Sequence, residues 1–92
     1  MNREEALSLL NAKLNEYRKL SYGQLAARVG DEEFPEVVGP SGTQYQIEIQ
    51  IVWDDKPGGD VRVLAAIDDG GWRAFMPLCD SLIVTVDGEA NE

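Results

Sequence analysis

The sequence has no histidine and only one cysteine among its 92 residues. Without histidine, the chain cannot form a Ser-His-Asp triad, a Cys-His pair or a histidine-ligated metal centre. A single cysteine cannot form an internal disulfide or a thiolate cluster, which favours a reducing compartment. We therefore predict a protein that is not an enzyme, uses no cofactor and is cytoplasmic.

Basic residues are also scarce, because eight lysines and arginines stand against seventeen acids, for a formal net charge of −9 at pH 7. Such a charge disfavours binding to nucleic acid and to anionic membranes. The charge is uneven along the chain: residues 1–30 carry five bases and three acids, whereas residues 31–92 carry three bases and fourteen acids. The sequence thus predicts a strongly negative region in its second part.

Long apolar runs are missing too, since nothing approaches the ~18–20 apolar residues of a membrane span. The start of the chain is charged, unlike a signal peptide. The length fits one domain with a small core. We expect this single domain to cover residues 1–86, followed by a flexible acidic tail at residues 87–92.

The first thirty residues predict two helices, over residues 3–19 and 22–29. Each begins with the spacing of a capping box, in which the N-cap side chain and the side chain three residues later bond each other's backbone. The two boxes are Asn2 with Glu5, and Ser21 with Gln24. Apolar residues then recur at three- and four-residue steps. Gly30 is placed to end the second helix in a left-handed conformation.

After Gly30, apolar residues alternate with polar ones, which is the period of a half-buried strand. The predicted strands cover residues 34–38, 44–53, 61–67, 72–76 and 82–86. Pro35 suits an edge strand because it cannot donate to a ladder. Asp69-Gly70 predicts a two-residue type I′ hairpin turn, and residues 77–80 predict another turn.

Together these elements predict an α+β fold. Two N-terminal helices would pack on one face of a four- to five-stranded antiparallel meander sheet. The helices would cover the apolar side chains of residues 45–53, which would otherwise be exposed to water.

The turns also imply which residues lie opposite one another in the sheet. The implied pairs are Trp53 with Val61, Val52 with Arg62, Ile67 with Trp72, and Leu64 with Phe75. An apolar cluster rimmed by polar groups would then lie on the outer face, away from the helices, as a candidate interaction surface. Its predicted members are Gln46, Glu48, Gln50, Val52, Arg62, Leu64, Arg73 and Phe75.

Adjacent aspartates occur twice, at residues 54–55 and 68–69. They are predicted at opposite ends of one strand pair, roughly 20–25 Å apart, which is too far for a shared cation or an acid–base pair. One interpretation is that these aspartates form turns. The alternative is weak Ca²⁺ or Mg²⁺ binding by two groups: Asp54, Asp55 and Asp60, or Asp68 and Asp69.

Three stretches, residues 5–11, 53–60 and 68–75, carry a resemblance that extends over nearly the whole chain. The sequence resembles a group of small bacterial α+β proteins that have no assigned activity. The resemblance implies a bacterial, cytoplasmic protein that stands alone as a domain, and it implies no functional residue.

Three classes of function follow from these patterns. The first is a non-enzymatic protein-binding module that acts through the outer sheet face, on a partner or on a second copy. A sharper form of it is an acidic inhibitor or immunity-type protein that neutralises a basic partner. The second class is a metal-dependent protein that uses loop carboxylates. The third is a small-ligand carrier with a cavity of ~300 Å³ or more between helices and sheet.

Overall fold

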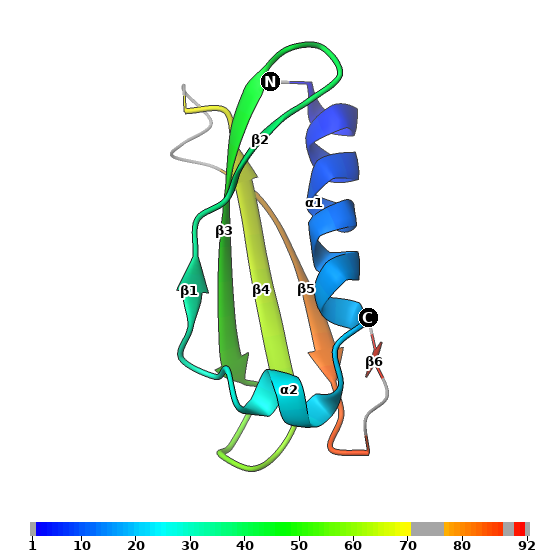
Figure 1. Cartoon of the computed structure of the whole chain (residues 1–92), viewed down its shortest axis with the longest axis vertical. Helices are drawn as coiled ribbons and strands as arrows, with labels where there is room; N and C mark the ends of the chain where they lie inside the picture. Colours follow the sequence, from blue (N-terminus) through cyan, green and yellow to red (C-terminus); the bar gives the residue numbers. More distant parts are fainter. Residues whose placement is uncertain (1, 71–76, 88–89, 92) are drawn as a thin grey trace.

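The structure is a computed structural model that describes residues 2–70, 77–87 and 90–91 (Figure 1). Its elements are α1 (Arg3–Arg18), α2 (Tyr22–Ala26), β1 (Glu32–Glu33), β2 (Glu36–Val38), β3 (Gln44–Trp53), β4 (Val61–Asp68), β5 (Leu78–Val84) and β6 (Ala90–Asn91). The strands pair antiparallel in the order β1-β3-β4-β5-β6, and β2 also pairs with β3. The α+β class and the antiparallel sheet are therefore confirmed. Among the helices of the described chain, none combines the length and apolar character needed to cross a membrane.

Helix α1 begins where the sequence predicts, and the Asn2 side chain accepts a hydrogen bond from the Glu5 backbone N–H at 3.1 Å. The predicted capping box is only half formed, because the Glu5 side chain accepts from Ser41 instead of from the Asn2 backbone. Acidic residues occupy the first turn of α1 and Arg18 its last, an arrangement that suits the helix dipole. Its buried side chains recur at three- and four-residue steps along one face: Ala6, Leu10, Leu14 and Tyr17. That face lies along β4 and β5 (Figure 1).

Helix α2 has the predicted capping box, with both of its hydrogen bonds present. It ends at Ala26, so the prediction that it extends to residue 29 was wrong. The backbone N–H groups of Arg28 and Val29 bond only three residues back, and the Gly30 N–H bonds the Ile51 carbonyl at 2.8 Å. Gly30 has a φ of +100°, which confirms its left-handed conformation and turns the chain toward the sheet.

The hairpin of β3 and β4 follows the predicted register. Trp53 lies opposite Val61, and Val52 lies opposite Arg62. Along β4, buried residues alternate strictly with half-buried ones, as expected for a strand with two different environments.

The predictions for the chain after β4 were wrong in part. The strand beside β4 is β5, so Ile67 lies opposite Leu78 rather than Trp72, and Leu64 lies opposite Ser81 rather than Phe75. The predicted strand 72–76 lies outside the described residues. Both segments have strand-like composition, and alternation alone does not decide which one pairs.

The two predicted turns near β5 were also wrong. Asp69 has no positive φ, which a type I′ turn requires, and only Gly70 does, at +80°. The Gly70 N–H instead bonds the Asp68 side chain at 2.8 Å. Residues 78–80 belong to β5 rather than to a turn, and β5 ends at Val84 rather than at residue 86.

The two sheet edges are built from short strands. The predicted edge strand 34–38 was right only for residues 36–38, which form β2, whereas β1 at residues 32–33 was not predicted. Phe34 and Pro35 lie between these two strands, and both strands pair with β3. Pro35 cannot donate, but its carbonyl accepts from the Ile47 N–H at 2.9 Å, so the edge stays attached across the break. At the other edge, β6 pairs with Ile83 and Val84, although the sequence placed it in the tail.

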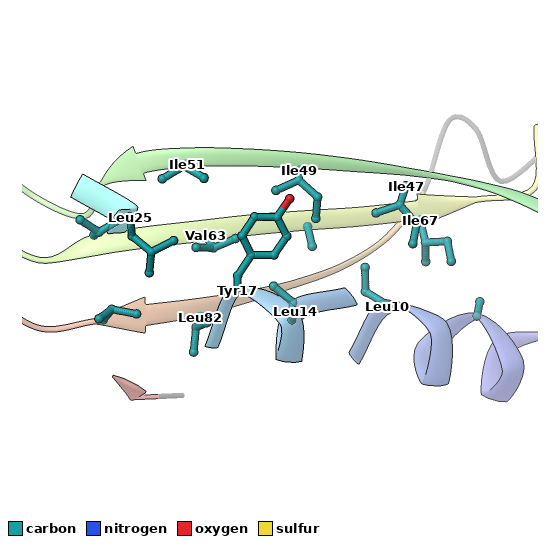
Figure 2. Packing of buried hydrophobic residues seen from close by; sticks show 14 of the residues in the cluster. Leu10, Leu14, Tyr17, Leu25, Ile47, Ile49, Ile51, Val63, Ile67 and Leu82 are labelled. Atoms are coloured by element: carbon teal, nitrogen blue, oxygen red, sulfur yellow. The ribbon is translucent and has the colours of Figure 1, made fainter. Parts of the chain in front are cut away.

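The hydrophobic core lies between α1 and the sheet (Figure 2). Leu10, Leu14 and Tyr17 of α1 point toward the sheet side chains. The sheet contributes Tyr45, Ile47, Ile49, Ile51, Val61, Val63, Ala65, Ile67, Leu82 and Val84, and α2 contributes Leu25. The opposite side of the sheet, which we call the outer face, is thus the side that these core residues do not occupy.

Candidate protein-binding face

The outer face is formed by alternate residues of β3, β4 and β5, because cross-strand partners share a face. From these strands it consists of Gln46, Glu48, Gln50, Val52, Arg62, Leu64, Ala66, Asp68, Cys79, Ser81 and Ile83. From the edge strands it gains Glu32 and Glu36, which lie opposite Gln50 and Gln46.

All the described members of the predicted interaction surface lie on this face. They are Gln46, Glu48, Gln50, Val52, Arg62 and Leu64. The other two predicted members, Arg73 and Phe75, lie outside the described residues. Sequence reasoning missed the contribution of β5, and the alternation that ends in Leu82 and Val84 was the signal for it.

The centre of the outer face is apolar and hollowed. A shallow groove of about 230 Å³ is lined by residues that include Leu64, Ala66 and Cys79. A second groove of about 220 Å³ includes Phe34 and Ala66. Both grooves share Glu48 and Ala66, so they adjoin, and Phe34 leaves 54% of its surface exposed.

The one arginine that the described chain places on this face is held by its neighbours. The Arg62 guanidinium bonds a single carboxylate oxygen of Asp54, through Nε at 2.8 Å and through a terminal nitrogen at 2.7 Å. Its other terminal nitrogen donates to the Ser81 hydroxyl at 3.1 Å. This pair neutralises the only positive side chain described on the face.

The carboxylates of the outer face are less constrained. Glu36 accepts from the Gln44 side chain at 2.7 Å, and Asp68 accepts from the Gly70 backbone. Within the described chain, the exposed carboxylates of Glu32 and Glu48 have no hydrogen-bond or ion-pair partner. The described part of the outer face therefore carries acidic side chains that no described base neutralises.

The loop aspartates take part in structural hydrogen bonds. Asp54 pairs with Arg62, and the Asp60 side chain accepts from the Val86 N–H at 3.1 Å. Asp68 binds the Gly70 backbone, at the other end of β4 from Asp54. Among the residues that the structure describes, no three His, Cys, Asp or Glu side chains come together as a group that could hold a metal ion. Of these contacts, the one made by Asp68 is local, as in a turn, whereas Asp54 and Asp60 bind residues of neighbouring strand segments.

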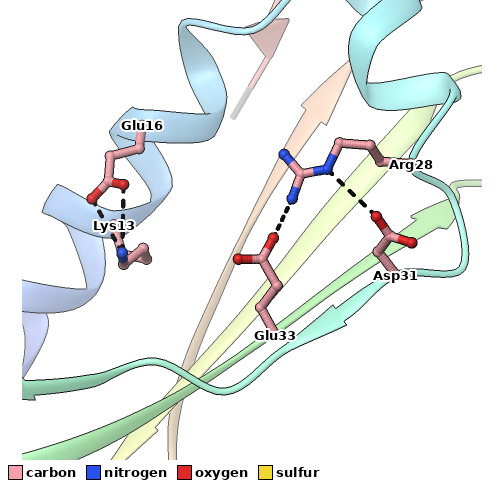
Figure 3. A network of polar contacts seen from close by, with 5 residues as sticks. All are labelled: Lys13, Glu16, Arg28, Asp31 and Glu33. Atoms are coloured by element: carbon pink, nitrogen blue, oxygen red, sulfur yellow. Dashed lines mark hydrogen bonds and ion pairs between the residues drawn. The ribbon is translucent and has the colours of Figure 1, made fainter.

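A separate polar cluster joins α2 to β1 (Figure 3). Arg28 bonds Glu33 and lies 3.5 Å from a carboxylate oxygen of Asp31. Its guanidinium also lies 5.5 Å from the centre of the Tyr17 ring. Burial, followed by the hydrogen bond to Glu33, raises the pKa of Tyr17 to about 12. The sequence did not predict this cluster, whose contacts indicate a structural role.

Comparison with family models, with curated proteins and with solved structures found no match for this chain. The described chain offers an apolar, hollowed sheet face that also carries acidic side chains, and such faces are candidate interaction surfaces.

Proposed function

We propose that the protein is a non-enzymatic protein-binding module that acts through the outer face. The observation that carries this proposal is the open apolar centre around Leu64 and Ala66, which adjoins two grooves. Both described helices bury their apolar side chains with the core residues, on the other side of the sheet. A partner that covered this centre would bury its apolar surface, which contributes a favourable free energy of about 25 cal/mol per Å².

The finer architecture belongs to the same proposal. In it, α1 and α2 form a backing layer on one side of the sheet, so the other side is left for a partner. Leu25 of α2 and Leu10 of α1 have no exposed surface, which supports this arrangement. A reducing cytoplasm would keep Cys79, exposed on the outer face, as a free thiol.

The alternatives predicted from the sequence have less support. A hollow of about 450 Å³ does lie between α1 and β5, but Leu14 is the only apolar residue among those that line it. Apolar side chains fill the core between α1 and the sheet in Figure 2. A small-ligand carrier, whose site would be mostly apolar, is therefore less supported. The loop aspartates bind Arg62 and backbone groups, which argues against a metal-dependent protein. An acidic inhibitor would be a narrower form of the binding module. It would be distinguished by loss of the partner's activity when one equivalent of this protein is added.

The proposal can be tested with the full chain as bait in a lysate of its host. Captured proteins are then purified, and their dissociation constants are measured for the natural sequence and for Leu64→Asp. We expect Leu64→Asp to weaken binding about tenfold or more. A few residues at the centre of an interface carry most of the binding energy, and the substitution puts a charge at that centre. Gln50→Arg, which leaves Leu64 in place, provides a second test should Leu64→Asp fail to fold.

The matched control is Ala12→Asp, which adds the same charge at an exposed position of α1. It should bind the partner as well as the natural sequence does. If the Leu64 and Gln50 variants both bound a purified partner as tightly as the natural sequence does, the assignment of binding to the outer face would be refuted.

A further inference from the structure

The chemistry of a partner for the outer face can be read from its charges, and this inference rests on the proposed function. Arg62 is already neutralised by Asp54, with nitrogen–oxygen distances of 2.7 and 2.8 Å. Glu32 and Glu48 are exposed and have no partner within the described chain. A partner that brings positive side chains to these carboxylates gains attraction without breaking an existing ion pair.

Glu48 has a special position in this arrangement. It lines both grooves together with Ala66, so Glu48 lies where the groove that includes Leu64 meets the groove that includes Phe34. When a side chain of a partner reaches Glu48, the adjacent parts of that partner therefore contact apolar surface. Long basic side chains suit such a place, because their aliphatic stems cover apolar groups while their charged ends stay polar.

We propose that the outer face binds a basic, extended segment of a partner protein. A lysine or arginine of the segment pairs with Glu48, and an apolar side chain of the segment covers Leu64. In an extended segment every second side chain faces the same surface. The outer face places the acidic Glu48 opposite Ala66 and the apolar Leu64 opposite Gln50. A basic and an apolar residue two positions apart in the segment therefore fit this surface.

A second copy of the chain is a poorer occupant. A twofold contact would bring the same carboxylates of both copies together, since an isologous interface places one patch against itself. Each copy also carries a formal net charge of −9. Like charges brought together at an interface oppose association, whereas a basic segment is attracted.

The test uses the full ¹⁵N-labelled chain and three capped six-residue peptides, with binding followed by amide chemical shifts. The first peptide carries arginine and leucine in turn at every second position, with serine between them, so that both kinds can face the surface. The second has glutamine in place of arginine, and the third has serine in place of leucine. We expect the first to bind saturably, with shifts gathered at outer-face residues. The second and third should each bind roughly tenfold more weakly, because each lacks one of the two contacts.

Substitution of Glu48 provides the site-specific readout. Glu48→Gln should weaken the arginine–leucine peptide roughly two- to fivefold and leave the glutamine–leucine peptide unchanged. The control Glu4→Gln removes the same charge from an exposed position on α1 and should leave all three affinities unchanged. Raising the salt concentration from about 0.05 M to about 0.3 M should weaken only the arginine peptides.

The outcomes separate this inference from the proposed function. Equal outer-face binding of the arginine–leucine and glutamine–leucine peptides would overturn the basic partner but leave the face a binding surface. If the arginine–leucine peptide shifted only amides outside the outer face, or shifted none, the inference would also be overturned. The Leu64 experiment tests the proposed function independently. If the chain sedimented as a dimer and Leu64→Asp made it a monomer, the occupant of the outer face would be a second copy and not a basic segment.

Discussion

Among single residues, Glu5 makes contacts that its place in the sequence does not reveal. Its carboxylate accepts from the Ser41 backbone N–H at 3.0 Å, from the Ser41 hydroxyl at 2.7 Å and from the Tyr45 hydroxyl at 3.3 Å. A Cβ atom at Gly39 would lie 1.8 Å from one of its oxygens, so a side chain at position 39 would displace the Glu5 carboxylate from this place. Glu5 thus links the start of α1 to the loop before β3.

These contacts make stability depend on pH. The Ser41 backbone hydrogen bond, followed by the Ser41 hydroxyl, lowers the pKa of Glu5 below its ordinary value of 4.5. Because the pKa is lower in the folded chain than in the unfolded chain, the stabilisation is complete above the unfolded pKa. It is lost as the pH falls through the folded pKa.

We therefore predict that Glu5→Gln lowers the melting temperature at pH 7 by a few degrees and has a smaller effect near pH 3. The neutral amide cannot accept these hydrogen bonds as a charged group does. Thermal unfolding followed by circular dichroism at both pH values provides the measurement. Glu4→Gln is the control, since it removes a first-turn charge without the Ser41 contacts. An equal loss at both pH values would show that the Glu5 charge does not matter.

Between elements, the turn at Gly30 connects α2 to the sheet. Gly30 has a φ of +100°, and a Cβ atom placed there would meet nothing within 4 Å. Any cost of a side chain at this position is therefore due to backbone conformation and not to a clash. Its N–H bond to the Ile51 carbonyl fixes the point where the chain joins the β3 edge.

We predict that Gly30→Ala lowers the free energy of unfolding by about 1–2 kcal/mol, the cost of a left-handed conformation for an L-residue. Urea denaturation measures the change. Gly23→Ala is the matched control, because Gly23 lies in α2, has no positive φ, and its nearest neighbour would be 4.0 Å away. That control should be neutral or stabilising by up to about 1 kcal/mol. Equal effects at both glycines would contradict the conformational explanation.

The elements also show how far sequence patterns extend. The strict alternation of residues 44–53 and 61–67, joined by a turn-forming loop, was enough to predict the register of β3 and β4. It also placed Val52 opposite Arg62 on the outer face. Such predictions succeed because a one-residue shift would exchange the buried and exposed sides of both strands.

The strand beside β4 was predicted only in part. Alternation indicated a strand from Leu82, but residues 77–80 predicted a turn and residues 72–76 predicted another strand, so the pattern alone did not select the neighbour of β4. The contributions of Cys79, Ser81 and Ile83 to the outer face were missed for that reason. The Asp54–Arg62 pair was missed for another reason, since it requires the geometry of the folded hairpin loop.

For the whole molecule, the balance of charge sets the response to salt. Four ion pairs of the described residues are partly exposed: Lys13–Glu16, Arg28–Asp31, Arg28–Glu33 and Arg62–Asp54. Exposed pairs contribute about 0–1 kcal/mol each. Opposing them is the mutual repulsion of a chain with seventeen acids and eight bases, which a compact fold brings closer together.

We predict that added salt stabilises the protein, because screening weakens the repulsion more than it weakens these pairs. The melting temperature should rise by several degrees as NaCl increases from about 0.02 M to about 0.5 M.

Glu48→Gln should raise the melting temperature at low salt and reduce its rise with salt, since this carboxylate contributes repulsion without an ion pair in the described chain. Arg62→Gln should have the opposite effect, because it releases Asp54. A melting temperature that falls with salt would mean that the ion pairs outweigh the repulsion.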